Sequence, residues 1–498
     1  MPQPPKQPGY SPEASDDAEV MRDFGYAPAL QRRLRPLAMF GISFSFISIS
    51  AGLYTSFGFG LATLGTASIW VWPVVLAGQL LVALVIAELG SRVPLAGYSY
   101  HWGARLIGSG YGWIIAICTL AFFTFAAASA AINLFAPLIA AFFGVTLSAD
   151  GLLAIALGVV ALGLVLNLVG IVAAAWVNNA GVWIEIVATL ALAVALVVAW
   201  ILHPHRGVGS LVNTGAVHGS SGVLGAIPSA LLLGLFCLTG FELAADLSED
   251  AIGARRSVPR AVLFALASAG IAGFLLLVGL DLATPNIAQV SSSSTPILAI
   301  VTYWFGPVVT RIVTAAVIVA IFVGFMVGMT AEARLIFALA RDRVIPASRW
   351  LSGLGERTKS PVRGVVVVAV LMAAVVVYGH FASNTFILLV DSTAILPFVV
   401  YLMIVAAFIV RGRRLAEYAT SFSLGRWRPL VAGIALVWTL AALAMLTLPH
   451  AYREADYTVL VIIALGVVWY AVGLRPRLRS GVAGLGREQT QDAPGELV

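Results

Sequence analysis

The strongest constraint in this sequence is a series of apolar stretches, each long enough for one helix to cross a bilayer, which takes about 20 residues. They lie at 37–62, 66–91, 110–144, 152–172, 178–202, 225–248, 260–282, 309–340, 362–380, 384–410, 429–449 and 457–474. The strands of a membrane barrel would alternate in polarity over about ten residues, and that pattern does not occur. We therefore expect an all-α polytopic membrane protein with twelve transmembrane helices.

Composition excludes the main alternatives. Charged residues make up 10% of the 498 residues and apolar residues 60%, whereas soluble domains are about a quarter charged. A soluble enzyme and a disordered chain are therefore excluded. Two cysteines, Cys118 and Cys237, support neither a disulfide scaffold nor a metal site. The net charge of +6 does not indicate nucleic-acid binding, because position matters more than the sum.

The positions of the basic residues predict how the helices are oriented. With a cytoplasmic N-terminus, all of the 29 Lys and Arg residues except Arg206, Arg311 and Arg453 lie in cytoplasmic segments or at cytoplasmic helix ends. Both termini are then cytoplasmic. The excess of Arg over Lys, with much Ala and Gly, is typical of a GC-rich bacterial genome, so we expect a bacterial inner or plasma membrane.

The chain divides into one membrane domain and two polar ends. We expect a cytoplasmic arm at 1–36 without a signal peptide, a transporter domain at 37–474, and a cytoplasmic tail at 475–498. Within the domain the predicted parts are a first repeat, a second repeat and two extra helices, at 37–202, 225–410 and 429–474.

Two of the predicted spans are interrupted at their centres in a similar way. The first carries Ser48, Ser50 and Gly52, and the sixth carries Thr239 and Gly240. Such residues weaken a helix, and an unwound backbone is tolerated in a membrane only where it lines a cavity. The two spans are five apart, so they occupy equivalent places in inverted halves. That arrangement indicates a transporter with its site at the breaks, although small residues also serve ordinary helix packing.

Four segments carry a family resemblance. They are FGISFSFISISAGLYTSFGFG in the first span, AELGSRVPLAGYSYHWGARL after the second, LTGFELAADLSEDAIGARRSVPRAV from the sixth, and RLIFALARDRVIPASRWLS after the eighth. Over about residues 35–475 the chain resembles the amino acid–polyamine–organocation permeases, nearest the branch of amino acid, GABA and choline permeases. The resemblance implies a LeuT-type fold, with a 5+5 inverted repeat, helices 1 and 6 broken, and two further C-terminal helices. The last motif usually has a small residue where this chain has Arg343.

A zwitterionic substrate needs groups that replace the water around both of its charges. Unwound backbone offers N–H groups and a positive helix end to a carboxylate, and C=O groups to an ammonium. We therefore expect the substrate to be bound by Ile49, Ser50, Ala51, Gly52, Phe236, Cys237, Leu238, Thr239 and Gly240. Phe236 aligns with a residue that covers the substrate in related antiporters; simple packing is the alternative.

Three intramembrane carboxylates are candidates for gating or proton coupling, because such groups are costly and by default functional. Glu242 resembles the acidic gate residue of related antiporters. Glu185 lies in the fifth span, and Asp391 lies near the middle of the tenth beside two hydroxyl residues. For each, a structural hydrogen bond to a neighbouring helix is the alternative reading.

Other polar residues near the helix ends are given other roles. Four carboxylates near Arg clusters are expected to form inner-gate or structural ion pairs, namely Glu88, Asp246, Glu249 and Asp250. His101 is either a pH sensor or an interfacial residue. No role is assigned to Asp281 or Glu332.

The sequence predicts a secondary active transporter, not an enzyme, that moves amino acids by alternating access with proton-coupled symport or exchange. Sodium coupling is disfavoured because residues 315–329 contain no Ser or Thr. The main alternative is a carrier of a cationic amine such as choline, ethanolamine, a polyamine or a GABA-like compound. A receptor, an intramembrane enzyme and a channel fit less well. We expect no cofactor or metal. The expected partners are a small-molecule substrate, the proton and the lipid bilayer; the oligomeric state is left open.

Overall fold

The computed structural model describes residues 21–26, 30, 32–169, 171–204, 207–215, 222–356, 359–381, 385–448 and 453–486. Most of the predicted arm, the end of the predicted tail and Arg206 lie outside these residues. In the described part the regular structure is helical, apart from one isolated bridge between Leu34 and Ala251. The helices in chain order are α2 Pro36–Ile47, α3 Ile49–Leu64, η1 Gly65–Trp70, α4 Val71–Arg92, α5 Tyr98–Leu106, α6 Ser109–Ser129, η2 Ala130–Phe135, α7 Ala136–Phe143, α8 Ala149–Val169, α9 Ile171–Leu202, η3 Val208–Val212, α10 Gly222–Cys237, α11 Leu243–Asp246, η4 Ser248–Asp250, α12 Ala254–Ala283, α13 Ile287–Ser291, α14 Pro296–Arg341, α15 Ser348–Leu351, α16 Val362–Phe381, α17 Thr385–Arg411, η5 Gly412–Leu415, η6 Gly425–Trp427, α18 Arg428–Thr447, α19 Arg453–Trp469, η8 Tyr470–Leu474 and α20 Arg475–Arg479.

In the described part of the chain the predicted apolar stretches lie mostly on helices, and the sixth is interrupted at 238–242. Among the described residues, 10 helical stretches are long and apolar enough to cross a membrane. One of them, Pro36–Arg92, contains the first two predicted spans, and the sixth span appears as the shorter apolar helix Gly225–Cys237. The prediction of an all-helical, multi-pass membrane protein is confirmed.

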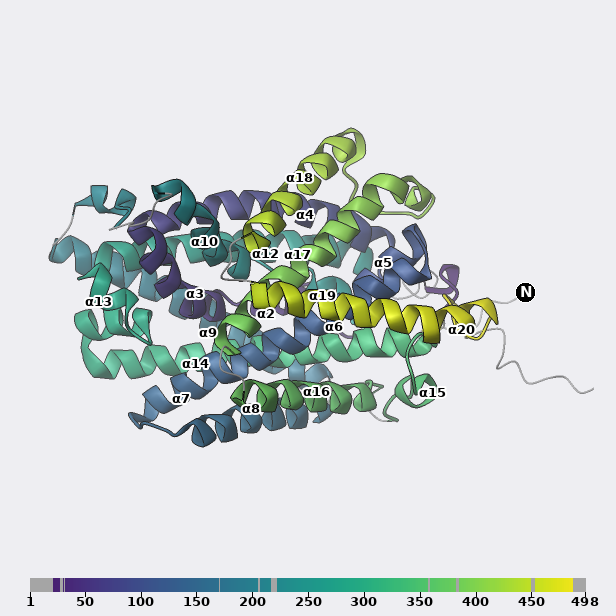
Figure 1. The fold of residues 1–498 in the computed structure, drawn as a ribbon, viewed down its shortest axis with the longest axis horizontal. Helices are drawn as coiled ribbons and strands as arrows, with labels where there is room; N and C mark the ends of the chain where they lie inside the picture. Colours follow the sequence, from purple (N-terminus) through teal and green to yellow (C-terminus); the bar gives the residue numbers. More distant parts are fainter. Residues whose placement is uncertain are drawn as a thin grey trace, which may run out of the picture.

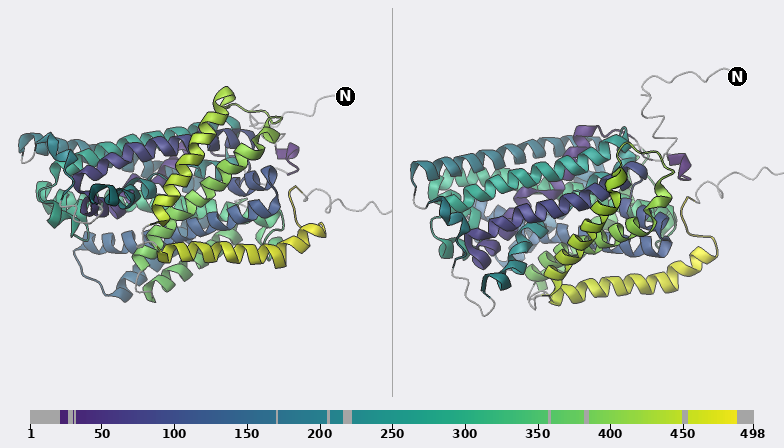
Figure 2. Two further views of the ribbon diagram at one scale, coloured as in Figure 1. Left: turned by 45° about the horizontal axis from the view of Figure 1, so that its top comes forward. Right: turned by 90° about the horizontal axis from the view of Figure 1, so that it is seen from above.

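The long helices pack side by side into an elongated bundle (Figure 1). α12 packs against α4, α9 and α2, while α14 packs against α9, α16, α2 and α3. α8 and α16 pack together along the lower edge of the view, and α19 runs along the outside of the bundle (Figures 1 and 2). The broken helices α2, α3, α10 and α11 are thus enclosed by longer neighbours.

The surface of the bundle is apolar where a soluble protein would be polar. Val187 and Val194 on α9, Val370 on α16 and Val437 on α18 are each more than 60% exposed. Polar side chains such as Gln79 and Glu185 are instead buried between the helices. This inversion suits a chain whose solvent is lipid, because apolar side chains need no shielding there.

Several helices extend beyond their predicted starts, most of all α9 and α14. α9 begins at Ile171, seven residues before the predicted span at 178. α14 begins at Pro296 because a first segment continues into the span through a kink at Gly306, where φ is 75° and ψ is −180°. Pro307 follows and removes a backbone donor, which is a standard cause of a kink.

One end of the bundle carries most of the arginines. We call this the arginine-rich end; it is formed by the segments joining α4 to α6, α11 to α12 and α14 to α16, and it lies on the right of Figure 1. Residues 21–26 lie there, and Gly25 packs against Gly486. Gly484 also donates a backbone hydrogen bond of 3.0 Å to Asp342. Both ends of the described chain therefore lie at the same end of the bundle.

Candidate functional site

The first break lies at a single residue between α2 and α3. Ser48 has φ 38° and ψ 89°, a left-handed conformation that ends α2 and starts α3. Its hydroxyl oxygen accepts a hydrogen bond of 3.2 Å from the amide of Ala51. Serine is a favoured cap because it satisfies an amide that the first helical turn leaves free. The Ser-rich sequence thus both interrupts the helix and stabilises the new start.

The second break covers residues 238–242, between α10 and α11. Gly240 has φ 83°, and a Cβ there would lie 2.2 Å from the Phe46 ring. Only glycine fits, for both conformational and steric reasons. The amide of Gly240 donates to the Tyr401 hydroxyl at 3.2 Å, and Thr239 donates to the Phe236 carbonyl at 3.1 Å. Side chains from inside and outside the break therefore hold its backbone.

The two breaks pack directly against each other. A Cβ on Gly52 would lie 2.5 Å from the Cys237 sulfur. The helices α3 and α10 are therefore in close contact at this point, without room for a larger residue than glycine. Ser43 of α2 donates to the Phe241 carbonyl at 2.7 Å and accepts from the Ala244 amide at 3.1 Å. The start of α3 and the end of α10 consequently meet as one unit.

A cavity of about 90 Å³ lies beside this unit. Its lining comes from the two breaks and from α6, η2, α14 and α17: Ser45, Phe46, Ile47, Ser48, Ala51, Gly52, Thr55, Phe122, Ala126, Ala127, Ser129, Ala130, Leu134, Phe236, Thr239, Ile321, Gly324, Phe325, Gly328 and Thr393. One water molecule needs about 10–15 Å³ of such space, so the cavity has room for a small solute.

Four of the nine predicted substrate residues line this cavity: Ala51, Gly52, Phe236 and Thr239. The other five, Ile49, Ser50, Cys237, Leu238 and Gly240, belong to the same two break regions but do not line it. The described residues that line the cavity include phenylalanines, serines and threonines but no charged side chain. A charged ligand there would have to be met by hydroxyl groups, backbone dipoles and ring faces.

Glu185 of α9 binds the first break. One of its carboxylate oxygens accepts hydrogen bonds from the Ser48 hydroxyl at 3.1 Å and from the Ser50 amide at 3.0 Å. Its side chain is buried. A carboxylate suits the positive end of α3. The Ser50 amide, predicted for the substrate carboxylate, is therefore occupied by a carboxylate of the protein itself.

Glu242 binds the second break and does not line the cavity. It accepts hydrogen bonds from the Tyr401 hydroxyl at 2.7 Å and from the Tyr98 hydroxyl at 3.3 Å. Tyr401 belongs to α17 and Tyr98 to α5, so this buried carboxylate connects three parts of the bundle.

Asp391 of α17 also lies outside the lining, although its neighbour Thr393 contributes to it. Asp391 is 4% exposed, and one carboxylate oxygen has no hydrogen-bond partner. It interacts electrostatically with Asp456 of the outer helix α19. Its role in gating or proton coupling stays a prediction.

The sequence interpretation gave no role to Glu332, which is fully buried in α14 one turn from the cavity-lining Gly328. It accepts a hydrogen bond of 2.5 Å from the Thr124 hydroxyl, and its second oxygen has no partner. An intramembrane carboxylate is itself a signal of function, and that signal was present in the sequence.

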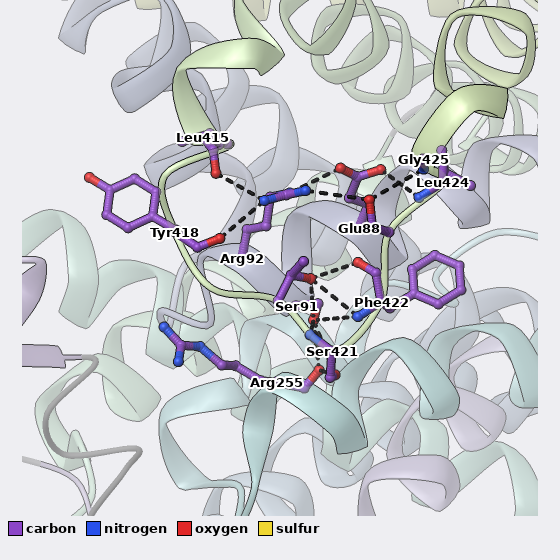
Figure 3. A network of polar contacts seen from close by, with 12 residues as sticks. Glu88, Ser91, Arg92, Arg255, Leu415, Tyr418, Ser421, Phe422, Leu424 and Gly425 are labelled. Carbon is purple, nitrogen blue, oxygen red and sulfur yellow. Dashed lines mark hydrogen bonds and ion pairs between the residues drawn. The ribbon is translucent and has the colours of Figure 1, made fainter.

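Ion pairs close the arginine-rich end, as expected for its carboxylates. Arg341 pairs with Glu249 at 2.8 Å, and Arg334 pairs with Asp250 at 3.0 Å. Glu88 pairs instead with Arg92 and binds the amide of Leu424, in a network that fastens the segment from Leu415 to Gly425 (Figure 3). Among the described residues Asp246 has no ion-pair partner within 4 Å; its carboxylate accepts a hydrogen bond from the Gly97 amide at 2.7 Å.

The N-terminal segment adds a second closure at this end. The Tyr26 hydroxyl bonds both Asp342 oxygens at 2.9 Å, and Tyr100 donates to the same carboxylate at 2.9 Å. Burial raises the pKa of Asp342 to about 6, an effect that nearby Arg341 partly offsets. His101 is fully buried against the rings of Tyr26 and Tyr100, and burial lowers its pKa.

Comparison with known proteins matches residues 34–469 to the family model described as amino acid permease. The amino-acid permease BAT1 of Arabidopsis thaliana is 24% identical over 88% of this chain and 89% of its own length. The GABA-specific permease of Saccharomyces cerevisiae is 25% identical over 70% of this chain and 63% of its own. The thiamine transporter thi9 of Schizosaccharomyces pombe is 23% identical over 92% and 85%. These relatives are eukaryotic and give no support to a bacterial origin.

Proposed function

The chain belongs to the amino acid permease family of membrane transporters, and we propose that it is a secondary carrier of a small zwitterionic amino acid, driven by protons. The observation that carries this proposal is the placement of two helix ends of opposite polarity beside one cavity. The positive start of α3 reaches it through Ala51, and the negative end of α10 reaches it through Phe236. This pair of dipoles suits a carboxylate and an ammonium on one small molecule.

We propose the LeuT-type topology for the whole chain. Twelve crossings would form two inverted five-helix repeats, 37–202 and 225–410, with two extra helices at 429–474. The breaks at Ser48 and at 238–242 support it, because they occupy equivalent helices of the two halves. An even number of crossings also fits the position of both described chain ends at the arginine-rich end. The arginine bias makes that end, with its arm and tail, the cytoplasmic one.

Glu185 gives a physical route to proton coupling. While ionised, it occupies the Ser50 amide and the positive start of α3, where a substrate carboxylate would otherwise bind. When a proton neutralises Glu185, this amide and the dipole become available to the substrate. Proton and substrate would then bind together, which is the requirement for symport. Glu242 would act as the gate at the second break, and Asp391 remains a weaker candidate.

Residues 315–329 of α14 offer no hydroxyl ligand for sodium beside the first break. Gly324 of α14 packs so closely on the Ser45 carbonyl that a Cβ there would lie 2.3 Å from the oxygen. This helix therefore presents backbone rather than hydroxyl groups to α2, which favours the proton as the coupling ion.

A carrier of cationic amines is the second candidate. Phe46, Phe122, Phe236 and Phe325 all line the cavity, and aromatic faces attract cations. Such a substrate would not need the amides at the start of α3. The relatives include proteins named for GABA and for thiamine. Amines are therefore included in the uptake experiment.

Uptake into liposomes distinguishes the two functions. The purified protein is tested with labelled zwitterionic, acidic and cationic amino acids, GABA, choline, ethanolamine and putrescine, under proton gradients, under sodium gradients and in exchange. Proton-driven accumulation of a small zwitterion is the expected result. Uptake of amines alone, without competition by zwitterions, would reject the first function in favour of the second.

A further inference from the structure

A second cavity lies at the arginine-rich end, on the outside of the bundle. It has a volume of about 420 Å³. α12 supplies most of its wall, α4 supplies Leu80, and the segment before α18 supplies the rest; the lining residues are Leu80, Arg256, Pro259, Arg260, Leu263, Phe264, Ala267, Ser421 and Phe422. None of these residues lines the cavity at the breaks.

The polar part of this groove is cationic. Arg256 and Arg260 are four residues apart on α12, so their side chains lie on one face of the helix. Both side chains are exposed. Among the described residues no carboxylate lies within ion-pair distance of either guanidinium. Elsewhere at this end Arg92, Arg334 and Arg341 all have carboxylate partners.

The rest of the groove is apolar and extends along the helix. From Arg256 to Ala267 is eleven residues, or about 16 Å of helix at 1.5 Å per residue. Leu263 and Ala267 form the wall toward the middle of the predicted span, and the Phe264 side chain is 65% exposed. The groove thus changes from cationic at the predicted edge of the membrane to apolar inside it.

The third wall of the groove is held in place by hydrogen bonds. The Ser91 hydroxyl accepts from the amides of Ser421 and Phe422 at 3.0 and 3.2 Å. It donates to the Arg255 carbonyl at 2.8 Å, and Ser421 donates to the same carbonyl. Figure 3 shows how these contacts bring the segment against α4 and α12. The groove is therefore formed before any ligand binds.

We propose that this groove binds one anionic phospholipid. The phosphate group would lie between Arg256 and Arg260, while an acyl chain would follow Leu263, Phe264 and Ala267. Basic pockets at the edge of membrane helices suit such headgroups, because charge and apolar area are satisfied together. The occupied groove would join α12 to the segment that leads into α18 and α19.

Lipid retention measured by native mass spectrometry tests the proposal. The wild-type protein is compared with the double variant Arg256→Gln, Arg260→Gln after exchange into mixed phosphatidylglycerol and phosphatidylcholine micelles. Each arginine is worth about fivefold in binding to an anionic lipid, so the preference for phosphatidylglycerol should fall about 25-fold. The variants remove exposed charges and leave the helix interior unchanged, so folding should be retained.

The matched control is Arg411→Gln, Arg414→Gln, which removes two exposed arginines, at the end of α17 and in η5, that do not line the groove. The control should keep the wild-type preference. An equal loss in both double variants would mean general charge attraction and would overturn the proposal. So would protection of the wild type from thermal unfolding by inorganic phosphate alone to the same extent as by phosphatidylglycerol, since that would make the groove a small-anion site.

Discussion

At the scale of single residues, the most informative contact is between Glu185 and the Ser50 amide. It joins a charge in the fifth predicted span to the start of α3, 135 residues earlier in the chain. The sequence predicted that the same amide binds the substrate carboxylate. A carboxylate of the protein therefore stands in the place where a substrate carboxylate would be expected.

We expect Glu185→Gln to abolish proton-driven accumulation while exchange of internal for external substrate continues. A glutamine keeps the size and an oxygen acceptor for Ser50, but it does not change charge between pH 5 and 8. Accumulation should fall at least tenfold, and exchange should lose its dependence on pH. The measurement is uptake with an inward proton gradient beside counterflow without one. Continued accumulation by this variant would show that Glu185 does not carry the coupled proton, even if transport itself is as proposed.

Asp342 makes a pH-dependent contribution to stability. Its pKa is about 6 in the folded protein, above the usual value of an aspartate, so the folded state binds the proton more tightly. This contribution is fully present below about pH 4 and is lost as pH rises through about 6. His101, whose pKa is lowered, acts in the opposite direction, because its burial destabilises the folded protein as the pH falls. A comparison with a variant at position 342 is therefore needed to isolate the contribution of Asp342 to stability.

We therefore expect the Tm of Asp342→Asn to rise relative to that of the wild type as the pH increases from 4 to 7. The corresponding change in the difference between their free energies of unfolding is up to about 3 kcal/mol. Thermal unfolding in detergent at several pH values measures this difference. Glu417→Gln removes an exposed carboxylate at the same end and serves as the control. A Tm difference that does not change with pH would contradict the assigned role of Asp342.

At the scale of elements, the two breaks depend on glycines that let helices approach. Gly52 of α3 faces Cys237 of α10, and a Cβ at Gly52 would lie 2.5 Å from its sulfur and 2.8 Å from its Cβ. The sulfur can rotate away, but the Cβ cannot move without shifting the end of α10. The spacing of α3 and α10 is therefore set by the absence of one methyl group.

We expect Gly52→Ala to cost about 1–3 kcal/mol in stability, the usual range for overpacking. Transport should fall strongly, because the cavity lies beside this contact. Gly433→Ala on α18 is the matched control, since nothing lies within 4 Å of a Cβ at Gly433. It should be neutral or slightly stabilising, because alanine favours a helix. Equal Tm values for the two variants would mean that α3 and α10 are not tightly packed.

At the scale of the whole molecule, the arginine-rich end is closed by ion pairs between distant helices. Arg341 and Glu249 are both fully buried there. Removing one partner would leave a buried charge, which is strongly destabilising, whereas removing both need not be. The double variant Arg341→Gln, Glu249→Gln therefore tests closure with less risk to the fold.

We expect this double variant to expose the central cavity to the arginine-rich end. In a chain with Cys118→Ser and Cys237→Ala, Ala126→Cys places one thiol at the cavity wall. A polar thiol reagent should label it at least tenfold faster when the Arg341–Glu249 pair is absent. The control is Arg92→Gln, Glu88→Gln, which removes a buried pair that fastens residues 415–425 (Figure 3). Equal labelling in both would contradict a gating role for Arg341 and Glu249.

The sequence alone determined the class of the protein and the places where its helices break. Bilayer thickness fixes the length of an apolar run, so in the described part of the chain the predicted spans coincide with apolar helices, apart from the break in the sixth. Ser48 and Gly240 marked the interruptions because their effects on the backbone are local. The carboxylates of the arginine-rich end were also identified, since charged residues concentrate at helix ends.

Only the tertiary structure decided which side chains meet. The rotation of each helix about its axis follows from packing against neighbours far away in the sequence, so a run of apolar residues does not reveal which face is inside. That is why Glu332 was given no role, although it is fully buried one turn from the cavity-lining Gly328. The contact of Glu185 with Ser48 and Ser50 depends on the same rotations, and it became visible only once α9 was packed against α2 and α3.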